Sequence, residues 1–126
     1  MKTAAKPESG KSVRVNGRSM RISHKSSVIV CGAISGLSLE KGRRLLEGLV
    51  TGRQSLGGKY YTNVAGELLR MLNQGEANAE FKGLDTSRLF VHASANKGFT
   101  FWRPRRFKLR RRQRKMTNIN MMLEQR

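Results

Sequence analysis

The sequence contains few of the residues that build metal centres or disulfide frameworks. It has one cysteine, Cys31, and two histidines, His24 and His92. A single cysteine excludes an intramolecular disulfide and a multi-cysteine zinc site, and no pair among these three residues stands at ligand spacing. We therefore expect no metal and no cofactor. Cys31 is predicted to be a small buried hydrophobe, and His24 a polar residue in a first helical turn.

Long apolar runs are also lacking. No stretch approaches the roughly 18 residues of a membrane-spanning helix, and residues 1–8 have no apolar core of a secretory signal. The lone cysteine fits a reducing compartment. A length of 126 residues, with 37% hydrophobic residues, allows one compact domain with a modest core.

Acidic residues are scarce. Eight Asp and Glu face 26 Lys and Arg, which gives a net charge of +18. Residues 1–35 carry +6, residues 36–88 only +2, and residues 89–126 carry +10. Such a charge repels itself and favours a polyanionic partner. Nucleic acid is the first candidate because neutralised phosphates release counterions, an anionic membrane surface is the second, and an acidic protein is the third.

Catalytic motifs are weak. Residues 5–12, AKPESGKS, match a relaxed phosphate-loop pattern, but only four residues precede them, where the chemistry needs a buried strand. Glu76 and Glu80 stand at i, i+4 on a helix, a spacing that could serve acid/base chemistry or metal binding. Solvated surface charge that answers nearby Lys and Arg is the simpler interpretation. No Ser-His-Asp arrangement is apparent. We expect no catalytic residues and no enzymatic activity.

The first half of the chain predicts a tail, a strand and two helices. Residues 1–11 are polar and predict a flexible basic tail, and a short strand is expected near 18–22. Ser23 can cap a helix to about Ile34, although the β-branched run 28–31 fits a buried strand equally well. Ser38 caps a second helix that ends at Thr51-Gly52. Its apolar stripe comprises Leu39, Leu45, Leu46, Leu49 and Val50.

A longer helix is expected from about Thr62 to Lys82-Gly83, with an apolar residue every three or four positions. Gly75 interrupts this helix at a cost of roughly 1 kcal/mol relative to Ala. The predicted buried face comprises Val64, Leu68, Met71, Leu72 and Ala79.

In the last third the apolar period changes from 3.6 to 2. Leu89, Val91, Ala93 and Ala95 share one face, and 119, 121 and 123 repeat the pattern. These two runs predict one antiparallel hairpin over about 89–123. Pairing Val91 with Met121 places the tip at Arg106 and lets residues 97–106 project by about 30 Å. Because a two-stranded ribbon is marginal in water, we expect order there only when phosphates surround it.

The stretch between these runs is the strongest functional signal. Nine of the thirteen residues 103–115 are basic and none is acidic. Arginine binds phosphate bidentately, and aromatic rings stack on unpaired bases. The return run at 119–123 disfavours a merely disordered tail, and His92 is expected at the surface or facing RNA. The interleaved aromatics are Phe99, Phe101, Trp102 and Phe107.

Several motifs resemble one ribosomal protein family. Residues 78–85, NAEFKGLD, resemble the end of the long helix in the large-subunit protein numbered twenty-two in bacteria and seventeen in eukaryotes, in its archaeal and eukaryotic form. Residues 58–62, GKYYT, resemble the lead-in to that helix, and residues 21–25, RISHK, the entry to the first helix. The resemblance implies an α+β fold: a small three-stranded antiparallel sheet on three helices, with a long protruding hairpin. Residues 12–126 would form this single domain.

The resemblance also implies binding to large-subunit ribosomal RNA, with the hairpin lining the nascent-peptide exit tunnel. The stretch 97–118 is a few residues shorter than is usual, and bulky Arg106-Phe107 stand at the tip. The expected hairpin tip is Arg105, Arg106 and Phe107. The expected RNA-binding residues are Arg14, Arg18, Arg21, Lys25, Lys59, Lys97, Arg103, Arg105, Arg106, Lys108, Arg110, Arg111, Arg112, Arg114 and Lys115.

We therefore expect a structural ribosomal protein of the cytoplasmic large subunit. Its partners would be ribosomal RNA, neighbouring ribosomal proteins and the nascent polypeptide. A free-standing chromatin or RNA-chaperone protein shares the charge and is the alternative from another class. A nucleotide-dependent enzyme rests on residues 5–12 alone.

Overall fold

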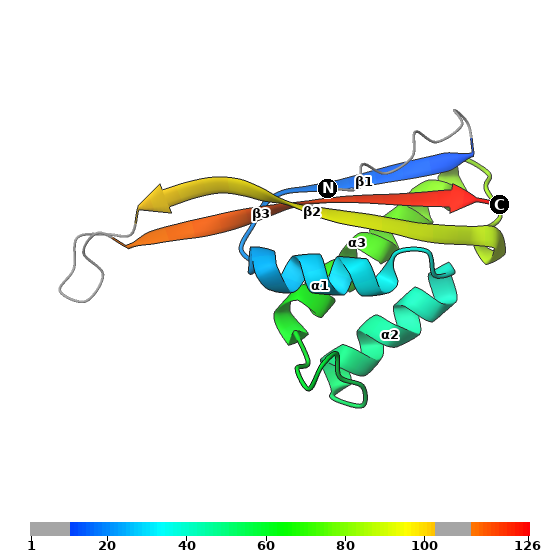
Figure 1. Cartoon of the computed structure of the whole chain (residues 1–126). Helices are drawn as coiled ribbons and strands as arrows, with labels where there is room; N and C mark the ends of the chain where they lie inside the picture. The colour runs from blue at the N-terminus through cyan, green and yellow to red at the C-terminus, as the bar shows by residue number, and fades with distance from the viewer. Residues whose placement is uncertain (1–10, 103–111) are drawn as a thin grey trace.

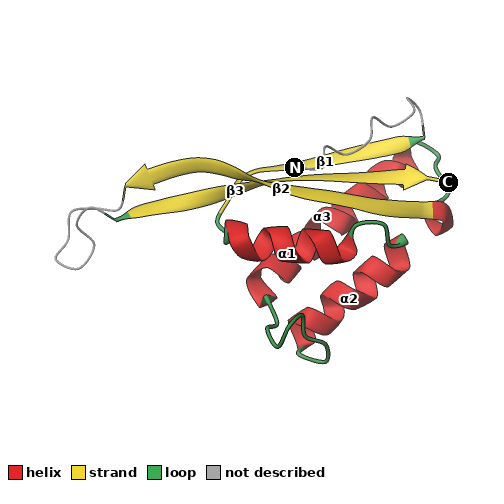
Figure 2. Cartoon of the chain, in the orientation of Figure 1, coloured by secondary structure: helices red, strands yellow, loops and turns green. Residues whose placement is uncertain are grey.

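The computed structural model describes residues 11–102 and 112–126 (Figure 1). Three strands form one antiparallel sheet in the order β1-β3-β2, and three α-helices pack on it (Figure 2). This arrangement confirms the predicted α+β class. The expected tail at residues 1–11 lies outside the described residues except for Lys11, as do residues 103–111 with the expected tip. In chain order the elements are β1 (Ser12–Met20), α1 (His24–Ile34), α2 (Leu39–Thr51), α3 (Thr62–Phe81), the 3-10 turn η1 (Thr86–Arg88), β2 (Leu89–Trp102) and β3 (Gln113–Gln125).

The ambiguous run 28–31 is helical. Ser23 caps α1: its Oγ accepts from the Ser26 N–H at 3.5 Å, and its carbonyl accepts from the Ser27 N–H at 2.9 Å. Residues 27, 30, 31 and 34 are buried at helical spacing, while Val28 and Ile29 are 48% and 43% exposed. A buried strand would have hidden the whole run, so the helix interpretation is the correct one.

The helices α2 and α3 carry the predicted buried faces, with two exceptions. Leu45 is only half-buried, and Val50 is 42% exposed because it lies at the margin of the stripe. Gly52 ends α2 in a left-handed conformation, with φ 78°. Ser38 occupies the N-cap position of α2 without a side-chain cap bond, and its backbone forms a bridge to Phe90 on the sheet.

Gly75 marks the closest approach of α3 to the sheet. It is buried, and a Cβ built there would lie 2.8 Å from Leu123 Cδ1 and 3.2 Å from Val15 Cγ2. A real Cβ essentially never lies within 3.0 Å of a neighbouring heavy atom, so the contact with Leu123 would force a neighbour to move. The glycine predicted to weaken the helix is therefore the residue that lets the helix touch β1 and β3.

The outer edge of β2 is covered by the segment between α1 and α2. The Gly36 N–H donates to the Val91 carbonyl at 2.7 Å, and the Val91 N–H donates to the Leu37 carbonyl at 2.9 Å. Ser35 Oγ both donates to the Ala93 carbonyl and accepts from its N–H. Such cover removes an exposed sheet edge and fixes α1 beside the first half of β2.

The strands β2 and β3 pair along their length, as the alternating pattern predicted, but in a different register. Val91 faces Leu123 and not Met121. The expected pairing was wrong by two residues. An even shift keeps every side chain on its predicted face, so Val91, Ile119 and Leu123 are still fully buried.

The first strand was expected near 18–22 and instead occupies Ser12–Met20. Val13 and Val15 are buried on its inner face, and Ile22 is buried after the strand has ended. The pairing of β1 with β3 shifts between Gly17 and Met20, where Ser19 takes a positive φ of 52°. This irregularity turns the chain out of the sheet, so Ile22 belongs to the link to α1.

The sheet changes from three strands to two near Thr117. β1 ends at the pair Met20–Thr117, and β2 is irregular between Lys97 and Thr100 against the same part of β3. Gly98 permits this, because a Cβ there would lie 2.9 Å from the Met116 carbonyl oxygen. Beyond this level β2 and β3 continue as a ribbon past the helices (Figure 1). We call residues 98–102 and 112–116 the ribbon.

Candidate nucleic-acid interface

Nine of the predicted RNA-binding residues lie in the described parts of the chain. All nine side chains are exposed, and none of them forms an ion pair with another described residue. Arginine and lysine without a protein counter-charge at the surface are available to phosphates. They are Arg14 and Arg18 on β1, Arg21 before α1, Lys25 on α1, Lys59 before α3, Lys97 on β2, Arg112 just before β3, and Arg114 and Lys115 at the start of β3.

The remaining predicted cations, Arg103, Arg105, Arg106, Lys108, Arg110 and Arg111, lie outside the described residues, as does Phe107. Their roles remain predictions from the sequence.

The fold brings together the two segments that contain no acid. Residues 9–39 and 86–123 lack Asp and Glu altogether. They form β1, α1, β2 and most of β3, which are neighbours in the sheet or packed upon it. Most of the acids lie on α2 and α3. The charged side chains on β1, α1 and the ribbon are therefore all basic, and these elements form a cationic side that suits a polyanion. The one acid on the described strands, Glu124, lies at the opposite end of β3.

Two hydrogen bonds hold the link between β1 and α1 against the base of the ribbon. Thr117 is fully buried, and its Oγ1 donates to the Ile22 carbonyl at 2.9 Å. The Asn118 side-chain oxygen accepts from the Ser19 N–H at 2.9 Å. These bonds fix the backbone on either side of Arg21, and they place that cation beside the ribbon.

The aromatic residues of the ribbon are unequally exposed. Phe99 and Trp102 are 69% and 66% exposed, which places two large rings in solvent beside the cations. Phe101 is half-buried and pairs with Arg114 across the ribbon. Exposed rings among arginines are the arrangement that binds unpaired bases.

Some of the other charged or titratable groups are paired within the protein. Arg43 on α2 forms an ion pair with Glu76 on α3, as expected for a surface acid answering a nearby cation. At the other end of the sheet His92 Nε2 lies 3.4 Å from Glu124, and the Arg126 guanidinium lies over the Phe90 ring. His92 is therefore half-buried in a local cluster and not an open surface residue.

The remaining candidate residues take structural places. Cys31 is buried, and desolvation raises the pKa of its thiol to about 11. His24 begins α1, as predicted. Within the described ranges 11–102 and 112–126, no cluster of three His, Cys, Asp or Glu side chains could hold a metal. None of the helices in those ranges is long and apolar enough to cross a membrane.

Comparison with known proteins identifies the family of the chain. Residues 15–124 match the family model described as "Ribosomal protein L22p/L17e". The chain belongs to this family. The match runs from within β1 nearly to the end of β3, and so includes most of the first acid-free segment and all of the second. The family resemblance carried by the sequence motifs is confirmed.

Its curated relatives include archaeal members of the L22p/L17e family. The chain is 34% identical to "Large ribosomal subunit protein uL22" of Archaeoglobus fulgidus, over 96% of this chain and 94% of that protein. It is 33% identical to the proteins of the same name from Methanopyrus kandleri, over 71% of each chain, and Nitrosopumilus maritimus, over 68% of this chain and 69% of that protein. The Archaeoglobus alignment has 145 positions against 126 residues here, so that relative carries extra residues within the match.

The sequence did not reveal every residue of the candidate interface. Ser23 and Met116 lie beside the basic residues at the base of the ribbon, although neither has a charge or a ring to mark it. These two residues come together only because the chain leaves the sheet after Met20 and passes beside β3, and no local sequence pattern predicts that path.

Proposed function

We propose that this chain is a structural constituent of the cytoplasmic large ribosomal subunit and has no enzymatic activity. Residues 12–126 act as one RNA-binding domain, which includes the hairpin at about 89–123. The observation that carries the proposal is the cationic side of an L22p/L17e fold, built from two acid-free segments. Its partners are large-subunit ribosomal RNA and neighbouring ribosomal proteins.

The mechanism is electrostatic clamping. The globular core, stabilised by its own apolar residues, sits on folded RNA and presents the cations of β1, α1 and the ribbon to phosphates. The ribbon has lost its third strand and its cover of helices, so it is weak by itself. Phosphates on both sides neutralise its arginines and hold it extended. In return the arginines lower the repulsion between RNA segments.

The hairpin tip, with Arg105, Arg106 and Phe107, reaches the nascent-peptide exit tunnel in this proposal. The support is the family membership and the direction of the ribbon, which points away from the core (Figure 1). The stretch between Lys97 and Asn118, which is a few residues shorter than is usual in the family, would present a different tip to the nascent polypeptide.

Charge removal at the ribbon tests the RNA contact. The variant Arg112→Ala, Arg114→Ala, Lys115→Ala is compared with Lys41→Ala, Arg44→Ala, Arg70→Ala, which removes three exposed charges from α2 and α3. Affinity for the large-subunit RNA of the same organism is measured from low to high salt. Each phosphate contact contributes about 0.7–0.9 to the slope of log K against log salt. We expect the ribbon variant to lose about two to three units of slope, and the control variant close to none.

Equal slopes for the two variants would contradict the placement of the interface. Sedimentation tests the cellular role: the full chain should stay with the large subunit through a high-salt wash. Recovery in the chromatin or soluble fraction would favour a free-standing RNA chaperone instead. For the hairpin tip, changing Arg105, Arg106, Arg110, Arg111 and Arg112 together to Ala should impair subunit assembly and leave the helical circular-dichroism signal intact.

A further inference from the structure

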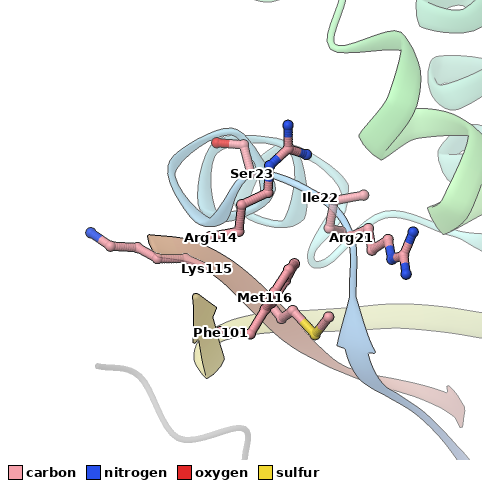
Figure 3. A pocket seen from close by; sticks show the side chains of 7 residues that line it. All are labelled: Arg21, Ile22, Ser23, Phe101, Arg114, Lys115 and Met116. Carbon is pink, nitrogen blue, oxygen red and sulfur yellow. The ribbon is translucent and has the colours of Figure 1, made fainter. Parts of the chain in front are cut away.

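A pocket lies where the ribbon leaves the core. It has a volume of about 570 Å³, within the range of roughly 300–1,000 Å³ that is typical of small-molecule sites. Its walls come from the link between β1 and α1 on one side and from β2 and β3 on the other (Figure 3). The hydrogen bond from Thr117 to the Ile22 carbonyl joins these two sides. The pocket is therefore a built feature of the fold, fixed by a buried contact beside it.

The lining combines an apolar part with a cationic part. Phe101, Met116 and Ile22 supply the apolar surface, and Arg21, Arg114 and Lys115 supply three positive charges. Every lining residue belongs to the acid-free segments 9–39 and 86–123, so no carboxylate faces the cavity. A ligand that matches this lining has a flat apolar portion and a strongly anionic portion.

We propose that this pocket binds a single unpaired nucleotide of RNA, with its base against Phe101 and the phosphates on either side of it held by the cations at the rim. The proposal rests on the RNA-binding function proposed above and names the ligand of one part of that surface. An aromatic ring and a methionine provide a stacking surface for a base of any sequence. Arginine and lysine at the rim hold the flanking phosphates.

The geometry favours an unpaired nucleotide over a duplex. In an RNA helix the base faces are stacked on their neighbours, and only a splayed base offers a face to a protein ring. The exposed rings of Phe99 and Trp102 do not line this cavity. A peptide ligand is disfavoured, because its backbone carries no charge to match three cations.

The proposal is tested with an RNA stem that carries one bulged nucleotide. Two versions are compared, one with a bulged adenosine and one with an abasic residue at the same place, so that the number of phosphates is identical. Binding to the full-length chain is measured by fluorescence anisotropy. Stacking contributes about 5- to 150-fold in affinity per base, so the wild-type chain should prefer the adenosine by such a factor.

Substitutions locate the effect. Phe101→Ala should abolish the preference for adenosine, and Phe101→Leu, which keeps an apolar side chain of similar size, should reduce it strongly. Phe81→Ala, which removes an exposed ring from the end of α3, outside both the ribbon and the pocket, should leave the preference unchanged. Arg114→Ala should weaken binding of both RNAs by the same factor. Circular dichroism checks that each variant is folded.

Equal affinity of the wild-type chain for the two RNAs would overturn the proposal, as would a preference that survives Phe101→Ala or disappears in Phe81→Ala. These results are separable from failure of the proposed function. A chain that sediments with the large subunit and yet shows no preference for the base would retain its ribosomal role without a nucleotide pocket.

Discussion

The contact of α3 with the sheet yields a prediction whose sign opposes helix propensity. Replacing Gly by Ala inside a helix normally stabilises a protein, by about 0.5–1 kcal/mol, because glycine loses more backbone entropy on folding. Two glycines of α3, Gly66 and Gly75, have ordinary helical backbones. Gly66 is exposed, and a Cβ there meets no atom within 4 Å. Gly66→Ala should therefore raise the free energy of unfolding by about 0.5–1 kcal/mol.

Gly75→Ala should do the opposite. The new methyl would stand 2.8 Å from Leu123 Cδ1 and 3.2 Å from Val15 Cγ2, and both partners are buried core residues. Overpacking of this kind costs about 1–3 kcal/mol. The helix-propensity gain of about 0.5–1 kcal/mol offsets part of this cost, so the net loss should be about 0–2.5 kcal/mol. Because the propensity gain is common to both variants, the difference between them, about 1–3 kcal/mol, measures the overpacking alone.

Urea unfolding followed by the helical circular-dichroism signal measures both variants. A constant high salt concentration screens the repulsion of the +18 charge. The dependence of unfolding free energy on urea should be the same for wild type and variants, which shows that only stability has changed. If Gly75→Ala stabilises the chain as much as Gly66→Ala, then α3 does not approach the strands as closely as the structure indicates.

Three further predictions concern the core, the base of the ribbon and the ribbon itself. Because burial raises the pKa of the Cys31 thiol from 9.0 to about 11, the folded chain should resist a disulfide reagent at neutral pH, while the urea-unfolded chain should react. As the pH rises, the thiol of the unfolded chain ionises before that of the folded chain. The free energy of unfolding should therefore fall between pH 9.0 and about 11, and it should fall less in Cys31→Ala. Thr117→Val removes the donor to the Ile22 carbonyl at nearly constant volume, and urea unfolding should show a loss of about 1–3 kcal/mol; an unchanged stability would mean that this bond is replaced. In hydrogen exchange of the free chain, the amides of the ribbon should exchange much faster than those of Val91 and become protected on RNA; equal protection in the free chain would contradict a ribbon that depends on its ligand.

The sequence predicted the helices well because their apolar spacing is long and regular. It left the run 28–31 open, since β-branched residues suit a strand and a helix alike. The choice came from its surroundings: Ser23 caps the segment, and the sheet needs only the face of residues 27, 30, 31 and 34. Which of four apolar residues remain exposed is a property of the packing and not of the run.

The errors in the strands share one physical origin. Alternation identifies faces but cannot distinguish registers that differ by two residues, because the side-chain period of a strand is two. The alternating pattern also does not reveal where the pairing of two strands becomes irregular. Nothing in the sequence pattern of residues 12–22 shows that Ser19 has a positive φ and that the strand ends at Met20. The first strand was consequently placed too late, and Ile22 was assigned to it.

The candidate interface was partly predictable for a simple reason. Lys and Arg are almost never buried without a partner, so a cation far from any acid in the sequence is expected at the surface, and all nine described RNA-binding candidates are exposed. The pocket could not be predicted. It requires Ile22 and Met116, which are far apart in sequence, to meet beside Phe101, and only the folded sheet determines that meeting.

The change from three strands to two separates the stability of the core from the function of the ribbon. On the core side of Thr117, residues 117–124 of β3 pair with β1 as well as β2, the helices cover the sheet, and the inner side chains are buried. Beyond it the side chains are mostly exposed, and the strands hold only each other. Substitutions in the ribbon should therefore alter RNA binding at little cost in unfolding free energy. Thr117 belongs to both regions, since it is buried in the core and also holds one wall of the pocket. A variant at this residue should lose stability and the preference for an unpaired base together, whereas Phe101→Ala should lose the preference alone.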